Sequence, residues 1–263
     1  KSKLISPATS QAIEATVAEL EEAIFGGNRW FDLEDDILDE NKQDAEYIRN
    51  LLHEDLTKDG VKDAIAECLL NGAIFGTGIG KVLVQDKMEM VATEVPIPGT
   101  MTTMTETQEI PYTCVKLESV SPKEFVIDPT AATIDEALGV AHIVIKPKYM
   151  ITKGMKDGIY NDMPLGSYDK ADFGFDEEFS DSDEDDKVKI VEYWGLVPKR
   201  FLSGNSSSVD QFDYNDDELV EAVVTIANDD CVLRAAENPY MLNDRPFVSY
   251  QNDRVPSKFW GRG

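Results

Sequence analysis

The glycine-rich segment at residues 76–81, GTGIGK, is the first place where this chain could bind a phosphate. A P-loop has the pattern G-x-x-x-x-G-K-[ST] and lies between a strand and the helix that follows it. Here Phe75 occupies the position of the first glycine, and Val82 that of the Ser or Thr. The segment also follows a predicted helix, so no helix N-terminus faces it to hold an anion. We therefore predict a tight helix-to-strand turn that binds no nucleotide, so Lys81→Ala should abolish no ATP site.

A run of carboxylates at residues 167–187 is a candidate calcium site. Four carboxylates have the spacing of positions one, three, five and twelve of an EF-hand loop: Asp181, Asp183, Asp185 and Glu192. Asp186 occupies the position where that loop needs glycine, and residues 188–191 have the pattern of a strand instead of a helix. We favour a solvated, mobile acidic insertion that proteases cut early. A calcium-responsive or acidic interaction module is the alternative.

Other residue types that perform catalysis are scarce or scattered. His53 and His142 have no serine or cysteine context that suggests a triad. The cysteines are odd in number and far apart, which indicates a reducing compartment and buried, free thiols: Cys68, Cys114 and Cys231. Carboxylates are so abundant that no pair is marked out, and an enzyme fragment would need a perturbed pair in a pocket. We predict that the protein is not an enzyme, with no catalytic, cofactor-binding or metal residues and no cofactor.

The charge balance narrows the possible partners. Of the 263 residues, 51 are acidic and 25 basic, giving a net charge of −26. Affinity for nucleic-acid phosphates comes from clustered Lys and Arg, so we do not expect this chain to grip DNA. Its acidic surface is one that DNA can pass without sticking. The sequence has no signal peptide and no apolar run long enough to span a bilayer, so no membrane partner is expected.

Three N-terminal helices are predicted, at residues 6–25, 42–56 and 61–75. In the first, Ser6 and Pro7 form a start signal, and an apolar stripe repeats at helical spacing: Ile13, Val17, Leu20 and Ile24. The second should bury another such stripe: Ala45, Ile48, Leu52 and Leu56. The third, with Asp59 as a plausible N-cap, should bury a third: Val61, Ala64, Ile65, Cys68 and Leu69. His53 is interpreted as a surface or packing residue.

From residue 81 onwards, the sequence has patterns typical of β-strands. Strands are expected at residues 81–84, 88–95, 112–120, 124–127, 140–145, 188–194, 219–226 and 231–233. The connections include a loop at 96–109, turns at 128–130 and 228–230, and short helical segments near Asp135 and at 149–156. The predicted fold is α+β, with N-terminal helices packed on a mixed, largely antiparallel β region. We divide the chain into residues 1–166, the acidic insertion at 167–187, and a β-rich continuation at 188–263.

Several segments, taken in order, carry a family resemblance. They are SPATSQAIEATVAELEEAIFG, the aromatic WFDL, DAIAECLLNGAIFGTGIGKV, SPKEFVIDPTA, MITKGMKDGIYND and PFVSYQNDRVPSKFWGRG. Their order resembles the portal proteins, or head-to-tail connectors, of short-tailed bacteriophages. The matches span most of the chain, although each is short and chiefly structural. The acidic insertion and the Ser-rich segment at residues 203–208 look specific to this sequence.

The resemblance implies a structural subunit of a ring, usually of twelve copies, at one vertex of the capsid. DNA would enter and leave through the channel without sequence-specific binding. The implied partners are other copies of the chain, the major capsid or scaffolding protein, the terminase and a tail adaptor. The protein would be part of the virion and be assembled in the host cytoplasm. The chain would hold the family's wing and stop before the long stem helices, so we expect it to be mainly monomeric without them.

Overall fold

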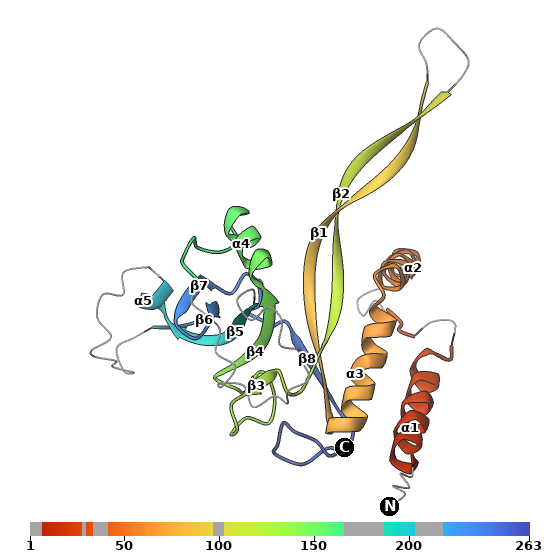
Figure 1. The fold of residues 1–263 in the computed structure, drawn as a ribbon. Helices are drawn as coiled ribbons and strands as arrows, with labels where there is room; N and C mark the ends of the chain where they lie inside the picture. The colour runs from red at the N-terminus through yellow and green to blue at the C-terminus, as the bar shows by residue number, and fades with distance from the viewer. Residues whose placement is uncertain (1–6, 28–29, 34–41, 97–102, 166–186, 203–217) are drawn as a thin grey trace, which may run out of the picture.

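The computed structural model describes residues 7–27, 30–33, 42–96, 103–165, 187–202 and 218–263. Three N-terminal helices lie on one side of a long β-hairpin, and a five-stranded sheet lies on the other (Figure 1). Within these residues, every pairing of neighbouring strands is antiparallel. The predicted α+β fold, with N-terminal helices packed on a largely antiparallel β region, is confirmed.

Helix α3 (Val61–Phe75) and strand β1 (Thr77–Pro96) meet at a single left-handed residue, Gly76, whose φ is 88°. Glycine adopts this conformation without the steric cost that other residues incur. The predicted glycine turn across residues 76–80 is wrong, because the strand begins directly after Gly76. One left-handed residue is therefore enough to reverse the chain from helix to strand.

The other glycines of this segment allow the helix and the strand to touch. A Cβ atom at Gly78 would lie 2.0 Å from the carbonyl oxygen of Cys68 in α3. A Cβ atom at Gly72 would lie 2.9 Å from the ring of Tyr250 and 3.4 Å from the backbone nitrogen of Gly78. The glycines thus set how closely α3 can approach β1.

The apolar stripe of α3 is buried at its key positions, as predicted: Val61, Cys68 and Leu69. The predicted N-cap is wrong. The N-cap residue is Gly60, with φ 70°, and Asp59 instead accepts a hydrogen bond from Lys87 at 3.4 Å. A left-handed glycine therefore links α3 to the preceding helix.

Strand β1 pairs along its whole length with β2 (Thr103–Val120), from Ile79 opposite Val120 to Pro96 opposite Thr103. The predicted loop at residues 96–109 is therefore wrong for residues 103–109, which are strand. Strand β8 (Phe247–Gln251) pairs with the first residues of β1, so the order at the base is β2-β1-β8. Beyond this base the hairpin is a two-stranded ribbon that projects from the molecule (Figure 1).

The second sheet has the order β3-β4-β5-β6-β7. Its strands are β3 (Phe125–Ile127), β4 (Gly139–Pro147), β5 (Lys187–Pro198), β6 (Leu219–Ala227) and β7 (Cys231–Glu237). The predicted hairpin between the last two is confirmed, and its turn contains Asn228 and Asp229 with φ of 46° and 68°. Helix α4 (Lys148–Lys156), also predicted, packs on this sheet through Ile151, and α5 (Lys199–Leu202) follows β5.

The main core fills the space between the two sheets. It joins residues of the hairpin base, of the five-stranded sheet and of the C-terminal segment: Ile79, Val120, Phe125, Ile127, Ala131, Ile134, Ala137, Val140, Trp194, Val223, Phe247 and Phe259. A smaller core lies under α4: Ile151, Val188, Ile190, Ala227, Cys231 and Leu233. All three cysteines are buried and free, as predicted. The main core therefore joins the two sheets at the base of the hairpin.

Helix α1 (Ala8–Phe25) starts two residues later than the predicted range of 6–25, with Pro7 at the N-cap, and Val17 is its one buried residue. Helix α2 (Lys42–Lys58) does not bury the predicted stripe. Ile48 and Leu52 are 50% and 39% exposed. Ala45 and Leu56 are half-buried, so the described elements cover only part of the apolar face that periodicity identified.

His53 of α2 packs against the rings of Trp30 and Phe31, which agrees with its interpretation as a packing residue. The turn after β3 is present, with the Ala131 amide donating to the Asp128 carbonyl. Residues 134–136 form a turn, so the short helical segment predicted near Asp135 is absent. The acidic insertion predicted at residues 167–187, including Asp181, Asp183 and Asp185 of the considered calcium site, lies outside the described residues except for Lys187, which begins β5. The Ser-rich segment also lies outside them.

Candidate functional site

A charged pair connects the two sheets at the hairpin base. The Nζ atom of Lys81, on β1, donates to Oε1 of Glu192, on β5, at 2.6 Å. The indole nitrogen of Trp194 donates to the same oxygen, also at 2.6 Å. The Lys81 ammonium also lies 5.6 Å from the centre of the Phe247 ring, a cation–π distance. The side chain of Lys81 is only 7% exposed, so this pair is largely removed from water.

The surroundings set the protonation states of this cluster. Burial would raise the pKa of Glu192, but the Lys81 charge and the bonds from Lys81 and Trp194 outweigh it and hold that pKa below its usual range. Burial, reinforced by the Lys81 charge, lowers the pKa of His142 to about 4. At neutral pH, Glu192 is thus an anion, Lys81 its counter-ion and His142 neutral.

This arrangement favours a structural role. Glu192 was the twelfth-position residue of the considered EF-hand pattern, but it lies on a strand and is already paired with Lys81. Lys81, the lysine of the considered phosphate loop, is likewise occupied. Among the described residues, no group of three His, Cys, Asp or Glu side chains is placed to hold a metal ion. The absence of catalytic, cofactor and metal residues stays a prediction.

The projecting part of the β1–β2 hairpin has an unusual outer surface. Several apolar side chains on one face of the ribbon are exposed: Val84, Met88, Met90, Pro111 and Val115. A ribbon face in water usually carries polar residues, which alternate with apolar residues on the packed face. Met88 and Met90 are 61% and 65% exposed. Such a face is typical of a surface that becomes covered on assembly.

The twist of the ribbon places that face away from the helices. At the base, Gly78 and Gly80 turn towards Cys68 of α3. Farther along, the opposite side faces the helices, where Glu89 accepts a 2.8 Å bond from Lys58 at the end of α2. Two-stranded ribbons twist more strongly than wider sheets. The apolar face of the outer half therefore points away from α2.

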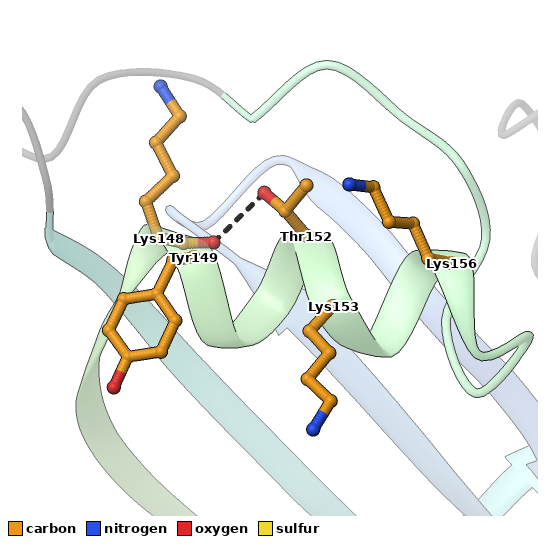
Figure 2. Close-up of a pocket in the computed structure, with 5 residues that line it drawn as sticks. All are labelled: Lys148, Tyr149, Thr152, Lys153 and Lys156. Carbon is orange, nitrogen blue, oxygen red and sulfur yellow. Dashed lines mark hydrogen bonds between the residues drawn. The ribbon is translucent and has the colours of Figure 1, made fainter.

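Helix α4 carries a second distinctive surface, a shallow depression of about 420 Å³ shown in Figure 2. It is lined by Lys148, Tyr149, Thr152, Lys153 and Lys156, all of them exposed. Lys148 and Lys156 extend on one side of the helix with Thr152, whereas Tyr149 and Lys153 extend on the other (Figure 2). The site holds no carboxylate or histidine, so it offers positive charge and an aromatic ring but no acid–base pair.

The inter-sheet pair, the exposed face of the hairpin and the surface of α4 are the distinctive features of the described residues. A family model described as "Phage SU10 portal protein" matches residues 81–263, well over half of the chain. The chain belongs to this portal protein family. No curated protein matches it. The predicted resemblance to bacteriophage portal proteins is thereby confirmed.

The portal family match covers most of the hairpin, the whole five-stranded sheet and α4. It begins at Lys81, so the inter-sheet pair lies inside the matched region, whereas α1, α2 and α3 precede it. Portal proteins are structural components of the virion, which agrees with the prediction of a non-enzymatic protein. No helix among the described residues has the length and apolar character needed to cross a membrane.

The sequence alone did not identify the inter-sheet pair. Lys81 and Glu192 are 111 positions apart, and no local pattern links them. Each is a charged residue inside a mostly apolar strand, and this was the sequence signal that could have indicated a buried ion pair. Arg245, just before β8, likewise makes contacts distant in sequence: it pairs with Glu221 at 2.7 Å and also donates to the Ala137 carbonyl. These contacts fix how the loops and sheets meet.

Proposed function

We propose that this chain forms the wing of a phage portal subunit. The subunits assemble into a ring at the capsid vertex, and we favour a ring of twelve copies. The portal family match over residues 81–263 is the observation that carries this proposal. The exposed apolar faces of the hairpin and of α2 support it, because other copies in a ring could cover them. The net charge of −26 suits a channel wall through which DNA moves during packaging and ejection.

The proposed partners are other copies of the chain, the major capsid or scaffolding protein, the terminase and a tail adaptor at the head–tail junction. We propose residues 1–166 and 188–263 as parts of one wing, interrupted by the acidic segment at 167–187. The pairing of β4 with β5 supports this, since it joins strands from both parts in one sheet.

Electron microscopy of the full-length portal protein, combined with light scattering after size exclusion, tests the proposal. We expect a closed ring with a central channel. A monomer under all salt conditions would contradict it.

A further inference from the structure

Helix α4 stands out because its charge opposes that of the rest of the chain. Its nine residues, KYMITKGMK, contain three lysines and no acidic residue, in a chain with a net charge of −26. The three lysines are exposed and form no ion pair with any residue that the structure describes: Lys148, Lys153 and Lys156. The buried face of α4, through Ile151 and Gly154, already supplies its packing.

Helix stability explains only part of this lysine set. Lys153 and Lys156 lie in the last turn, where positive charge favours the negative end of the helix dipole. Lys148 is the first helical residue, where a positive charge meets the positive end of the dipole, and no side chain caps that end. The position of Lys148 is thus unfavourable within the subunit and favours an anionic partner outside it.

Helix α1 has the opposite composition. Its 18 residues contain four glutamates and no lysine or arginine, and only Val17 is buried. The exposed glutamates include Glu19 and Glu22, three positions apart and hence on one face. Helix α1 packs on α3, with Val17 buried and Leu20 and Phe25 half-buried, and this packing leaves Glu19 and Glu22 exposed. Helix α1 therefore has an unpartnered acidic surface to present to another chain.

The two helices lie on opposite flanks of the subunit. In Figure 1, α1 and α4 are separated by the hairpin, with α3 on the side of α1 and the five-stranded sheet on the side of α4. A ring closes by head-to-tail contacts, which join two different surfaces of neighbouring copies. A surface on each flank, with opposite charge, has the arrangement that such a contact requires.

We propose that the lysine face of α4 docks on the acidic face of α1 of the next subunit in the ring. The inference rests on the proposed function, since it needs a ring. Copies with a net charge of −26 repel one another. The positively charged surface of α4 is attracted to an acidic surface of another copy, which orients the two copies as they associate. The lysines supply the cations, and Glu19 and Glu22 supply the anions. Tyr149, which extends on the same side of α4 as Lys153, adds contact area.

A charge-reversal cycle in the full-length portal protein tests this docking. The variants are Lys153→Glu with Lys156→Glu, Glu19→Lys with Glu22→Lys, and all four changes together. We expect each pair alone to raise the concentration at which rings dissociate by about tenfold, as two or more lost ion pairs would. The fourfold variant should return towards the wild-type value, measured by mass photometry across a dilution series.

The matched control is Lys123→Glu with Lys258→Glu, which changes the net charge equally at exposed lysines outside α4. Thermal unfolding followed by circular dichroism verifies that each variant folds, as expected for exposed positions. Carbodiimide cross-linking provides an independent readout, and should join a lysine of α4 to a glutamate of α1 between subunits. This cross-link should disappear when the ring is dissociated.

The outcomes separate the inference from the proposed function. Wild-type protein that never forms a ring overturns both. If the α4 variant and the control variant form rings that dissociate at the same concentration, the docking is overturned and the portal role stays intact. Failure of the fourfold variant to recover also overturns it. So does an α4 variant that forms normal rings but loses binding to a fluorescent DNA duplex, because the lysine face would then be a DNA surface.

Discussion

The base and the outer half of the β1–β2 hairpin are the same two strands in very different surroundings. At the base, Ile79 and Val120 are almost completely buried between α3 and the five-stranded sheet, and Lys81 is paired across the sheets. In the outer half, Met88 and Met90 are mostly exposed. The β1–β2 pairing is continuous, but at the base β1 also pairs with β8, which the outer half lacks. This third strand and the side-chain packing make the base a core and leave the outer half available for contacts.

The largest expected loss of stability comes from breaking the Lys81–Glu192 pair at the hairpin base. Glu192→Ala leaves the Lys81 ammonium buried without its counter-ion and removes the acceptor of the Trp194 indole. Removing one partner of a buried pair is strongly destabilising, and because Glu192 is partly exposed we expect about 3 kcal/mol. The control Glu218→Ala, which breaks an exposed pair with Lys199, should cost less than about 1 kcal/mol. Equal losses in urea unfolding would contradict the importance of the junction.

Gly78→Ala should be next in size. The new Cβ would lie 2.0 Å from the Cys68 carbonyl oxygen, so α3 must move away from β1. We expect a loss of about 2–3 kcal/mol in the free energy of unfolding. Gly60→Ala is the comparison, because Gly60 has free space but φ 70°, and should cost about 1 kcal/mol. A neutral Gly78→Ala would show that the contact between helix and strand is loose.

The pH dependence of stability should also report on the base. His142 has a folded pKa of about 4, below its usual 6.5, so the unfolded chain binds more protons between these values. Its contribution is complete above pH 6.5 and is lost as the pH falls to 4, by about 2 kcal/mol after allowing for partial exposure. The lowered pKa of Glu192 adds a loss of the same sign at lower pH. Urea unfolding from pH 7 to 4 measures the His142 contribution, and extending the series to lower pH adds that of Glu192.

His142→Gln should flatten this pH dependence, whereas His53→Gln should not. His53 stacks on Phe31 in the helical region, far from the sheet junction in the sequence. The same slope in both variants would show that His142 is not the titrating group.

The smallest effect should come from the outer half of the hairpin. Met88→Gln with Met90→Gln should change the stability of the subunit by less than about 0.5 kcal/mol, because surface substitutions disturb no packing. Ile79→Ala, at the buried base, should cost about 2–5 kcal/mol. A large loss in the methionine variant would mean that the outer half belongs to the folding core.

Comparing α3 with α2 shows how much of this fold could be predicted. Both helices were predicted from apolar periodicity, and both form. The stripe of α3 is buried because Gly72 and Gly78 let it approach β1, whereas Ile48 and Leu52 of α2 stay exposed. Periodicity tells which face of a helix is apolar. It does not tell what covers that face, particularly when the cover belongs to another chain.

The hairpin and the junction were missed for different reasons. Residues 103–109 are rich in threonine, which is common in strands, but the Thr-, Pro- and Met-rich composition of residues 96–109 was interpreted as a loop. Lys81 and Glu192 meet only because β1 and β5 come from sheets that pack together, and no local pattern contains that information. The family, in contrast, was predicted from short motifs in a fixed order, several of which correspond to helices, strands and turns of the structure, such as α3 with the start of β1.

Hydrogen–deuterium exchange of the chain, as a monomer and within the assembled portal, tests the division of the hairpin most directly. A two-stranded ribbon is marginal alone, so amides of the outer half, at residues 86–92 and 107–113, should exchange quickly in the monomer. Amides near Ile79 and Val120 should be strongly protected in both states. We predict that assembly slows exchange in the outer half and leaves the base unchanged. Outer-half amides as protected as the base in the monomer, or unprotected in the ring, would contradict it.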